Sequence, residues 1–315
     1  MEQSKMPPSA IFVSEQKEFE QAKERYRNIL RQLRPLAELE NLPTPPVNRA
    51  AYSDRMAWTM AHLAKLAYTP FEESDLGMEQ LEYALQSGWF NLMKTFNKKG
   101  TQAFIAKNDS FAVLAFRGTQ PNRWEDVRTD LRALKQKTVE GKVHKGFKDA
   151  FDDIRDEIVD TLRNSLGQDL PLYITGHSLG AALATVATQE LEEEFNDLIA
   201  ACYTFGSPRV GDGRYEKSIK APFYRIVNTT DIVTLVPFFF GSFIHVGDPR
   251  YLSRRKVDNV YQIYRGIPTV RRIIESTIET IAPIFRLHNP FWPWVAAHNM
   301  DFYIEKLESY AKARN

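Results

Sequence analysis

Residues 172–182 read LYITGHSLGAA and decide the fold. The run 172–175 is rich in β-branched and aromatic residues, which is typical of a buried strand. It passes through a turn with two glycines into the largely apolar run from Leu179 to about Leu191, which predicts a helix. A strand that leads directly into a helix is the building unit of parallel sheets that are covered by helices.

The same alternation of strands and helices continues on both sides of this stretch. Three more runs are rich in β-branched or aromatic residues and predict strands, at 111–116, 201–205 and 223–227. Apolar residues at helical spacing predict a helix before residue 172, with the stripe Phe147, Phe151, Ile154, Ile158 and Leu162. We therefore expect an α/β fold with a mainly parallel sheet and helices on both faces.

The first 50 residues predict an N-terminal helical extension and a proline-rich connector, followed by the main domain at 51–315. Apolar residues at helical spacing run through 14–34, and prolines stand at positions 35, 43, 45 and 46. A second helix is expected after a capping Ser53, with one apolar face formed by Met56, Met60, Leu63 and Ala67. The first helix either packs on the main body or binds a partner, and the sequence leaves both open.

Composition narrows the class of protein. The chain has 315 residues, 43% of them hydrophobic and 26% charged, which is typical of a globular protein. Its 41 basic and 40 acidic residues give a net charge of +1, which argues against nucleic acid as a partner. The single cysteine, Cys202, excludes an intramolecular disulfide. With neither a secretory signal nor a spanning segment in the pattern, we expect a cytoplasmic protein, at most peripheral to a membrane.

Ser178 is the candidate nucleophile. It stands between Gly176-His177 and Leu179-Gly180, on a tight turn from strand to helix that would expose its hydroxyl at the carboxyl edge of the sheet. Glycines are expected two residues to either side because a Cβ there would clash in so crowded a turn. A serine hydroxyl is a poor nucleophile at neutral pH, so it needs a base, an acid that orients the base, and donors for an oxyanion.

Asp231 is the candidate acid. It follows the predicted strand 223–227 after a short connection, so it lies at the same edge of the sheet as Ser178. The interval of 53 residues between the two leaves room for one helix and two strands. An aspartate in an ordinary surface turn is the alternative interpretation.

Three histidines follow Asp231 and compete for the role of base. His245 lies in an apolar run that resembles a strand, which favours a core histidine. His288 lies in the irregular segment Leu-His-Asn-Pro, whereas His298 directly precedes a terminal amphipathic helix. A base on a loop that is fixed by such a helix is well placed, so the pattern favours His298 and leaves His288 as the alternative.

Several motifs in a fixed order resemble those of one known family. They are Phe116-Arg117-Gly118-Thr119, Val143-His144-Lys145-Gly146-Phe147, the Gly-His-Ser-Leu-Gly turn at 176–180, Thr204-Phe205-Gly206-Ser207-Pro208-Arg209-Val210-Gly211, and Asn228-Thr229-Thr230-Asp231-Ile232-Val233. With them the chain resembles the class 3 lipases, which include the fungal triacylglycerol lipases, over about residues 50–310. The resemblance implies the α/β-hydrolase fold and the hydrolysis of lipid esters.

The resemblance also implies roles for particular residues. It assigns Ser178, Asp231 and His298 as a catalytic triad, with an oxyanion hole formed by Thr119 and the backbone N–H of Leu179. It further implies a candidate lid in the segment 120–131, where Trp124, Val127 and Leu131 share one helical face. A fixed helix start is the alternative there, and the segment is more charged than a typical lid.

Aromatic residues flank both the candidate acid and the candidate base, and they indicate either an acyl site with a membrane-facing rim or ordinary core packing. The two clusters are Phe238, Phe239, Phe240 and Phe243, and Phe291, Trp292 and Trp294. We expect the partners to be a lipid or other ester substrate and the surface of a membrane or lipid droplet. No cofactor is expected, and no Cys-x-x-Cys or His-x-x-x-His pair suggests a metal. A phospholipase, a short-chain esterase and a non-catalytic lipid-binding scaffold are the competing hypotheses.

Overall fold

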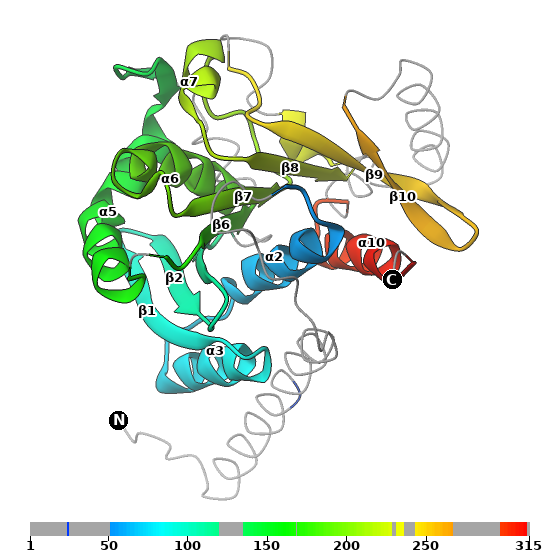
Figure 1. Cartoon of the computed structure of the whole chain (residues 1–315), viewed down its shortest axis with the longest axis horizontal. Coiled ribbons are helices and arrows are strands. Elements are labelled where there is room, and N and C mark those ends of the chain that lie inside the picture. Colours follow the sequence, from blue (N-terminus) through cyan, green and yellow to red (C-terminus); the bar gives the residue numbers. More distant parts are fainter. Residues whose placement is uncertain are drawn as a thin grey trace, which may run out of the picture.

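The stretch around Ser178 lies at the centre of an eight-stranded sheet in the computed structural model (Figure 1). The structure describes residue 24 and residues 51–119, 135–167, 169–228, 231–235, 243–266 and 297–313. The described helices are α2 (Asp54–Leu66), α3 (Asp75–Ser87), α5 (Lys145–Ser165), α6 (Leu179–Phe195), α7 (Gly213–Ser218) and α10 (Met300–Ala313), with a 3₁₀ turn at Ile232–Leu235.

The main sheet has the strand order β1-β2-β3-β6-β7-β8-β9-β10. Its strands are β1 (Asn91–Lys98), β2 (Thr101–Lys107), β3 (Ala112–Phe116), β6 (Leu172–His177), β7 (Ile199–Phe205), β8 (Phe223–Asn228), β9 (Asp248–Val257) and β10 (Val260–Arg265), while β4 (Lys135–Lys137) and β5 (Lys142–His144) form a separate hairpin. The pairs from β3 through β9 are parallel, and those at both ends of the sheet are antiparallel. The predicted mainly parallel sheet is confirmed.

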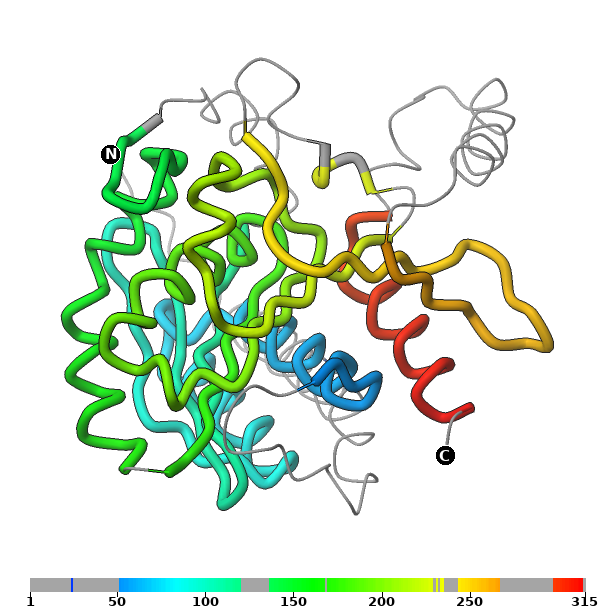
Figure 2. Tube along the Cα trace, turned by 45° about the horizontal axis from the view of Figure 1, so that its top comes forward, coloured from blue at the N-terminus to red at the C-terminus, as the bar shows by residue number. Residues whose placement is uncertain are grey.

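Helices cover both faces of this sheet, as predicted. α5 and α6 lie on one face, and α2, α3 and α10 lie on the other, where α2 and α10 are side by side (Figures 1 and 2). The stripe predicted for α5 is buried throughout, from Phe147 to Leu162. Full burial of such a side chain contributes about 1.5–3 kcal/mol, so this stripe fixes the helix on the sheet.

The first helix of the main body begins where its sequence predicts. Ser53 is the N-cap of α2, and its hydroxyl accepts a hydrogen bond from the N–H of Met56 at 3.3 Å. Met56, Met60, Leu63 and Ala67 are all buried. The predicted N-terminal extension falls on residues 1–50, of which the structure describes only residue 24, so it stays a prediction.

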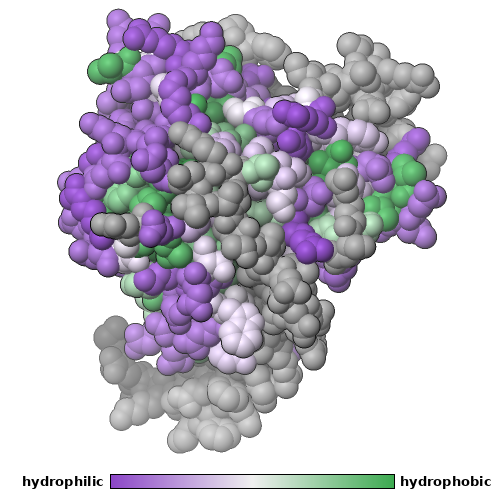
Figure 3. All heavy atoms as spheres, viewed as in Figure 1, coloured by the Kyte–Doolittle hydropathy of each residue, from purple (hydrophilic) through white to green (hydrophobic). Residues whose placement is uncertain are grey.

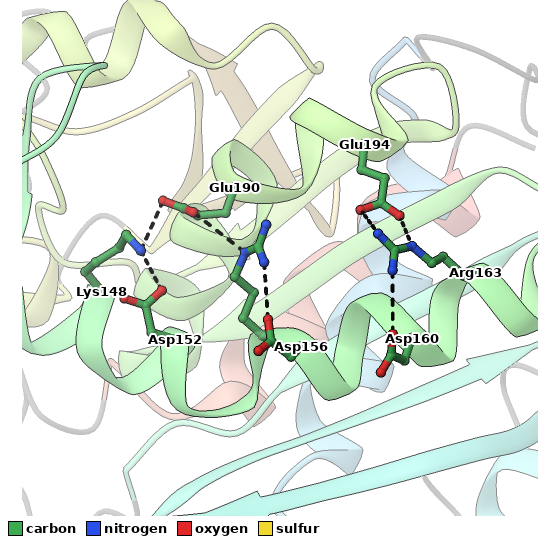
Figure 4. A network of polar contacts seen from close by, with 8 residues as sticks. Lys148, Asp152, Asp156, Asp160, Arg163, Glu190 and Glu194 are labelled. Carbon is green, nitrogen blue, oxygen red and sulfur yellow. Dashed lines mark hydrogen bonds and ion pairs between the residues drawn. The ribbon is translucent and has the colours of Figure 1, made fainter.

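Ion pairs join α5 and α6 along their outer surfaces (Figure 4). Glu190 on α6 contacts Lys148 at 3.4 Å and Arg155 at 3.9 Å, and Glu194 contacts Arg163 with a bidentate geometry. Since α6 begins at the turn that carries Ser178, these contacts lie on the helix that supports the turn.

Hydrophilic side chains cover much of the described surface on the face drawn in Figure 3, and hydrophobic residues form smaller, separate patches. Among the described residues, the structure contains no helix that is long and apolar enough to cross a membrane.

Candidate active site

Ser178 occupies a strained turn between β6 and α6. Its backbone has φ 62° and ψ −126°, a conformation that costs a non-glycine residue about 1–3 kcal/mol. A Cβ on Gly176 would lie 2.2 Å from the carbonyl oxygen of Gly180, and one on Gly180 would lie 2.4 Å from that of Phe116. Glycine is therefore required at both positions, for the steric reason inferred from the sequence. The N–H of Ser178 donates to the carbonyl oxygen of Phe205 at 2.9 Å, which holds the turn against β7.

The side chain of Ser178 is buried in this structure. Among the residues that the structure describes, its Oγ has no hydrogen-bond partner. A buried hydroxyl without a partner is costly, and a catalytic role is one of the reasons for which such a group is retained.

Asp231 and His298 form a buried pair at the same edge of the sheet. The Nδ1 of His298 lies 2.8 Å from the Oδ2 of Asp231. The other carboxylate oxygen accepts the N–H of Val233 at 2.9 Å, and Oδ2 also accepts the hydroxyl of Tyr303 at 2.6 Å. Burial first, and then the neighbouring Asp231, raise the pKa of Tyr303 well above its usual value, so this phenol stays a donor. Three donors thus converge on one carboxylate and fix its orientation.

Gly206 brings the turn of Ser178 close to this pair. It follows Phe205, which binds the N–H of Ser178, and it has a left-handed φ of 57°. A Cβ at this position would lie 2.6 Å from Oδ2 of Asp231 and 2.9 Å from Nδ1 of His298. Only glycine allows this close approach, which places the three predicted residues around one loop.

His177 connects the turn directly to the candidate base. Its Nε2 lies 2.8 Å from the carbonyl oxygen of His298, and the two imidazole rings lie 4.4 Å apart between centroids. Burial first, and then the nearby His298, hold the pKa of His177 well below its usual range. The residue that precedes Ser178 is therefore a neutral imidazole packed against His298.

Thr119 and Leu179, the predicted oxyanion-hole residues, follow the ends of the adjacent parallel strands β3 and β6. Gly118, just before Thr119, is in close contact with the turn. A Cβ on it would lie 2.4 Å from the carbonyl oxygen of His177 and 3.1 Å from the Cβ of Ser178. The backbone that leads into Thr119 thus passes directly beside the candidate nucleophile.

Arg117 fixes this end of β3. Its buried guanidinium donates to the carbonyl oxygen of Ala67 at 2.5 Å and to that of Thr69, and it forms a bidentate ion pair with Glu72. It also lies 4.7 Å from the ring centroid of Phe71. The segment after α2 is therefore tied to the strand that carries Thr119.

Asn228, at the end of β8, holds the chain next to His298. Its side-chain amide donates to the carbonyl oxygen of Ala297 at 2.8 Å, and its Oδ1 accepts from the buried Lys306 at 2.7 Å. Burial lowers the pKa of Lys306 to about 8. The backbone N–H of Asn228 donates to the hydroxyl of Tyr303 at 3.1 Å.

The sequence pattern does not assign Gly206, Asn228, Tyr303 or Lys306 individually to the site. Gly206 and Asn228 lie inside two of the motifs shared with the class 3 lipases, so those motifs could have indicated them as site residues. Tyr303 and Lys306 lie on the terminal helix, and nothing in the sequence indicates their polar contacts with β8 and Asp231.

His245 differs from its prediction. It lies between an isolated bridge at Ile244 and the start of β9 at Asp248, so it is not inside a strand. It is half-buried, and burial followed by the charges of Arg225 and Arg209 lowers its pKa to about 3.

Other predicted residues lie outside the part of the chain that the structure describes. They are His288, the candidate lid residues Trp124, Val127 and Leu131, and the aromatic residues Phe238, Phe239, Phe240, Phe291, Trp292 and Trp294. Phe243 is described and is buried, with its ring 5.9 Å from that of His144.

The amino-acid sequence is similar to those of known lipases. The family model described as Lipase (class 3) matches residues 113–241. A lipase from Rhizomucor miehei is 33% identical over 172 residues, which cover 51% of this chain and 47% of that protein. A chloroplastic phospholipase A(1) from Arabidopsis thaliana is 29% identical over 218 residues, covering 62% of this chain and 46% of that protein. Each match therefore spans about half the length of the relative.

Solved structures agree with the fold. The crystal structure of a lipase from Rhizopus microsporus var. chinensis superposes with a TM-score of 0.60 at 25% identity, covering 75% of this chain and 88% of that chain. The sheet with its covering helices is the α/β-hydrolase fold that the motifs imply.

Proposed function

We propose that this chain, which is similar to the class 3 lipases over residues 113–241, hydrolyses carboxylic esters of lipids through Ser178. The observation that carries the proposal is the buried hydrogen bond between Asp231 and His298 beside the strained turn of Ser178. A nucleophile, an oriented base and an acid at one sheet edge are the components that acyl transfer requires.

In the proposed reaction, Oγ of Ser178 attacks the ester carbonyl while Nε2 of His298 accepts its proton. Asp231 keeps Nδ1 of His298 protonated and oriented, and it stabilises the imidazolium that forms. The backbone N–H groups of Thr119 and Leu179 stabilise the oxyanion, and each such donor typically contributes about 3–4 kcal/mol to the transition state. His298 then returns its proton to the leaving alcohol, and water releases the acid from the acyl-enzyme in a second cycle.

Ser178→Ala tests the proposal. We expect hydrolysis of p-nitrophenyl butyrate to fall by at least 10³-fold, because the nucleophilic atom is removed. The thermal unfolding midpoint should not fall, because the variant removes only a buried hydroxyl without a described partner. A fluorophosphonate probe should label the wild type and not the variant. A wild-type protein that neither hydrolyses esters nor takes the label would support the non-catalytic scaffold instead.

A phospholipase is the second candidate, and the similarity to a chloroplastic phospholipase A(1) favours it. A panel of triacylglycerol, diacylglycerol, phosphatidylcholine and short-chain esters separates the candidates by their ratios of kcat/KM. A preference of more than tenfold for the phospholipid would replace triacylglycerol as the proposed substrate.

A further inference from the structure

Both ring nitrogens of His177 are engaged in hydrogen bonds, and these bonds define its tautomer. A carbonyl oxygen only accepts, so Nε2, at 2.8 Å from that of His298, carries the proton. The Nδ1 of the neutral ring is then an acceptor, and it lies 2.9 Å from the hydroxyl of Tyr68, which donates to it. His177 therefore receives a bond from Tyr68 and gives one to the main chain of His298.

Tyr68 joins this chain of hydrogen bonds to the strand end that carries Thr119. Its hydroxyl oxygen lies directly against Gly118, where an added Cβ would come within 2.2 Å of that oxygen. Arg117 binds the carbonyl oxygens of Ala67 and Thr69, the two neighbours of Tyr68. The phenol is thus held from both sides by the strand end that it contacts.

We propose that Tyr68 and His177 are positioning residues. They fix the main chain of His298 and the strand end at Gly118 in position relative to Ser178. The proposal rests on the proposed function, since it concerns the same catalytic groups. Asp231 orients the imidazole of His298 through Nδ1, whereas His177 binds its backbone carbonyl, so the two contacts fix different parts of the base. A displacement of about 1 Å at reacting groups is enough to lower a rate by roughly 10²-fold.

A neutral His177 is compatible with the protonation of His298 in the proposed reaction. In the proposed reaction His298 becomes positively charged, and its ring lies 4.4 Å from that of His177. A charged neighbour at this distance would oppose that step. Burial keeps His177 neutral, so the ring packs against the base without electrostatic repulsion.

Three variants test the roles separately with a soluble ester, p-nitrophenyl butyrate. Tyr68→Phe removes only the hydroxyl, His177→Phe keeps a ring but loses both bonds, and His177→Gln retains a donor near Nε2. We expect kcat to fall about tenfold for Tyr68→Phe and about 100-fold for His177→Phe, with KM within twofold. His177→Gln should recover at least tenfold of the loss in His177→Phe. Tyr215→Phe is the matched control, because this buried tyrosine lies on α7 and its hydroxyl has no partner among the described residues.

The rate of fluorophosphonate labelling of Ser178 separates positioning from simple stability. It should fall in parallel with kcat in the Tyr68 and His177 variants when each protein is assayed at a temperature at which circular dichroism shows it to be fully folded. The proposal is overturned if all three variants keep kcat within twofold, or if His177→Gln is no better than His177→Phe.

A spectroscopic measurement keeps this proposal distinct from the proposed function. In ¹⁵N-histidine-labelled wild type, we expect His177 to show the Nε2–H tautomer from pH 5 to 9 without titrating. Tyr68→Phe should shift the ring resonances of both His177 and His298. This result would support the positioning network even in a protein without esterase activity. A His177 that titrates near its ordinary pKa would refute the network even if Ser178 proves to be the nucleophile.

Discussion

Helices cover both faces of the sheet, but the polar contacts that these helices make differ between the two faces. On one face, α5 and α6 pack through apolar side chains and carry their ion pairs at the outer surface (Figure 4). On the other face, α10 directs the buried polar groups of Tyr303 and Lys306 at Asp231 and at Asn228 on β8. Ion pairs that keep partial contact with water are typically worth about 1 kcal/mol or less, whereas a buried polar group left without its partner costs about 1–3 kcal/mol.

This difference distinguishes the helices that stabilise the sheet from the helix that contacts the candidate active site. On the face covered by α5 and α6, here called the apolar face, the described ion pairs between the helices lie away from the candidate site. On the face covered by α2, α3 and α10, here called the polar face, Tyr303 and Lys306 each make a buried bond with a defined donor and acceptor next to His298. We therefore infer that α10 sets the geometry of the proposed base, and that α5 and α6 mainly supply stability.

Loss of His298 should have the largest effect on the polar face. We expect His298→Ala to lower kcat almost as much as Ser178→Ala, because the two act as one unit, and the double variant should lose little more. Steady-state kinetics with p-nitrophenyl butyrate measures all three proteins. His288→Ala is the control and should be mild. The reverse order of severity would make His288 the base.

Gly206 tests how closely the polar face must fit. A methyl group at this position would meet Asp231 and His298 at less than 3 Å, in a left-handed backbone conformation. We expect Gly206→Ala to lower kcat by about 10²-fold, because a shift of about 1 Å at the base has that effect.

Gly213→Ala is the matched control for that variant. Gly213 begins α7, and the nearest atom to an added Cβ is 3.6 Å away, which is an ordinary contact. It should keep wild-type kinetics, and circular dichroism shows whether both proteins are folded. Equal activity of the two glycine variants would contradict the close fit.

The central strands of the sheet are predictable from the sequence, whereas the outer strands are not. The strands β3, β6, β7 and β8 are short apolar runs because helices cover both of their faces. The strands near the two ends of the sheet do not follow this pattern. β9, for example, contains Arg254, Arg255 and Lys256, and its last residues are exposed.

The site is predictable where strand ends and chain order determine it. Ser178 and Asp231 follow parallel strands, so both must lie at one sheet edge, and His298 then follows from its place before α10. The support of that site depends on contacts between distant residues. The hydroxyl of Tyr303 binds Asp231, and Tyr68 binds His177 across 109 positions, yet both tyrosines read as ordinary apolar residues in the sequence.

His62 on α2 gives the polar face a dependence on pH. It is buried against Trp58, and burial, with a smaller effect of Lys65, lowers its pKa to about 3. Its pKa in the unfolded chain is about 6.5, so between these values the unfolded state binds more protons. Stability is therefore complete above about pH 6.5 and is lost as the pH falls, by up to about 1.4 kcal/mol per pH unit for this group.

Urea unfolding of the wild type and of His62→Leu at pH values from 8 to 4.5 measures this effect. The free energy of unfolding should depend less steeply on pH in the variant between pH 6 and 4.5, because one proton-binding group is missing. Identical slopes in the two proteins would show that His62 binds its proton equally in both states.

The smallest effect is expected on the apolar face, at Glu190. Its carboxylate contacts Lys148 and Arg155 on α5, and its side chain is 18% exposed. Glu190→Gln keeps the shape and removes the charge, so we expect the free energy of unfolding to fall by about 1 kcal/mol or less. High salt should shrink the difference further, because it screens the pairs in the wild type. Urea titrations in 0.05 M and 0.5 M NaCl measure both effects. Glu157→Gln, at a more exposed pair with Lys94, is the control and should change the free energy of unfolding less still.

Esterase activity should stay at the wild-type level in both variants. A loss of activity without a loss of stability in Glu190→Gln would mean that α6 transmits its position to Ser178, and the division between the two faces would fail.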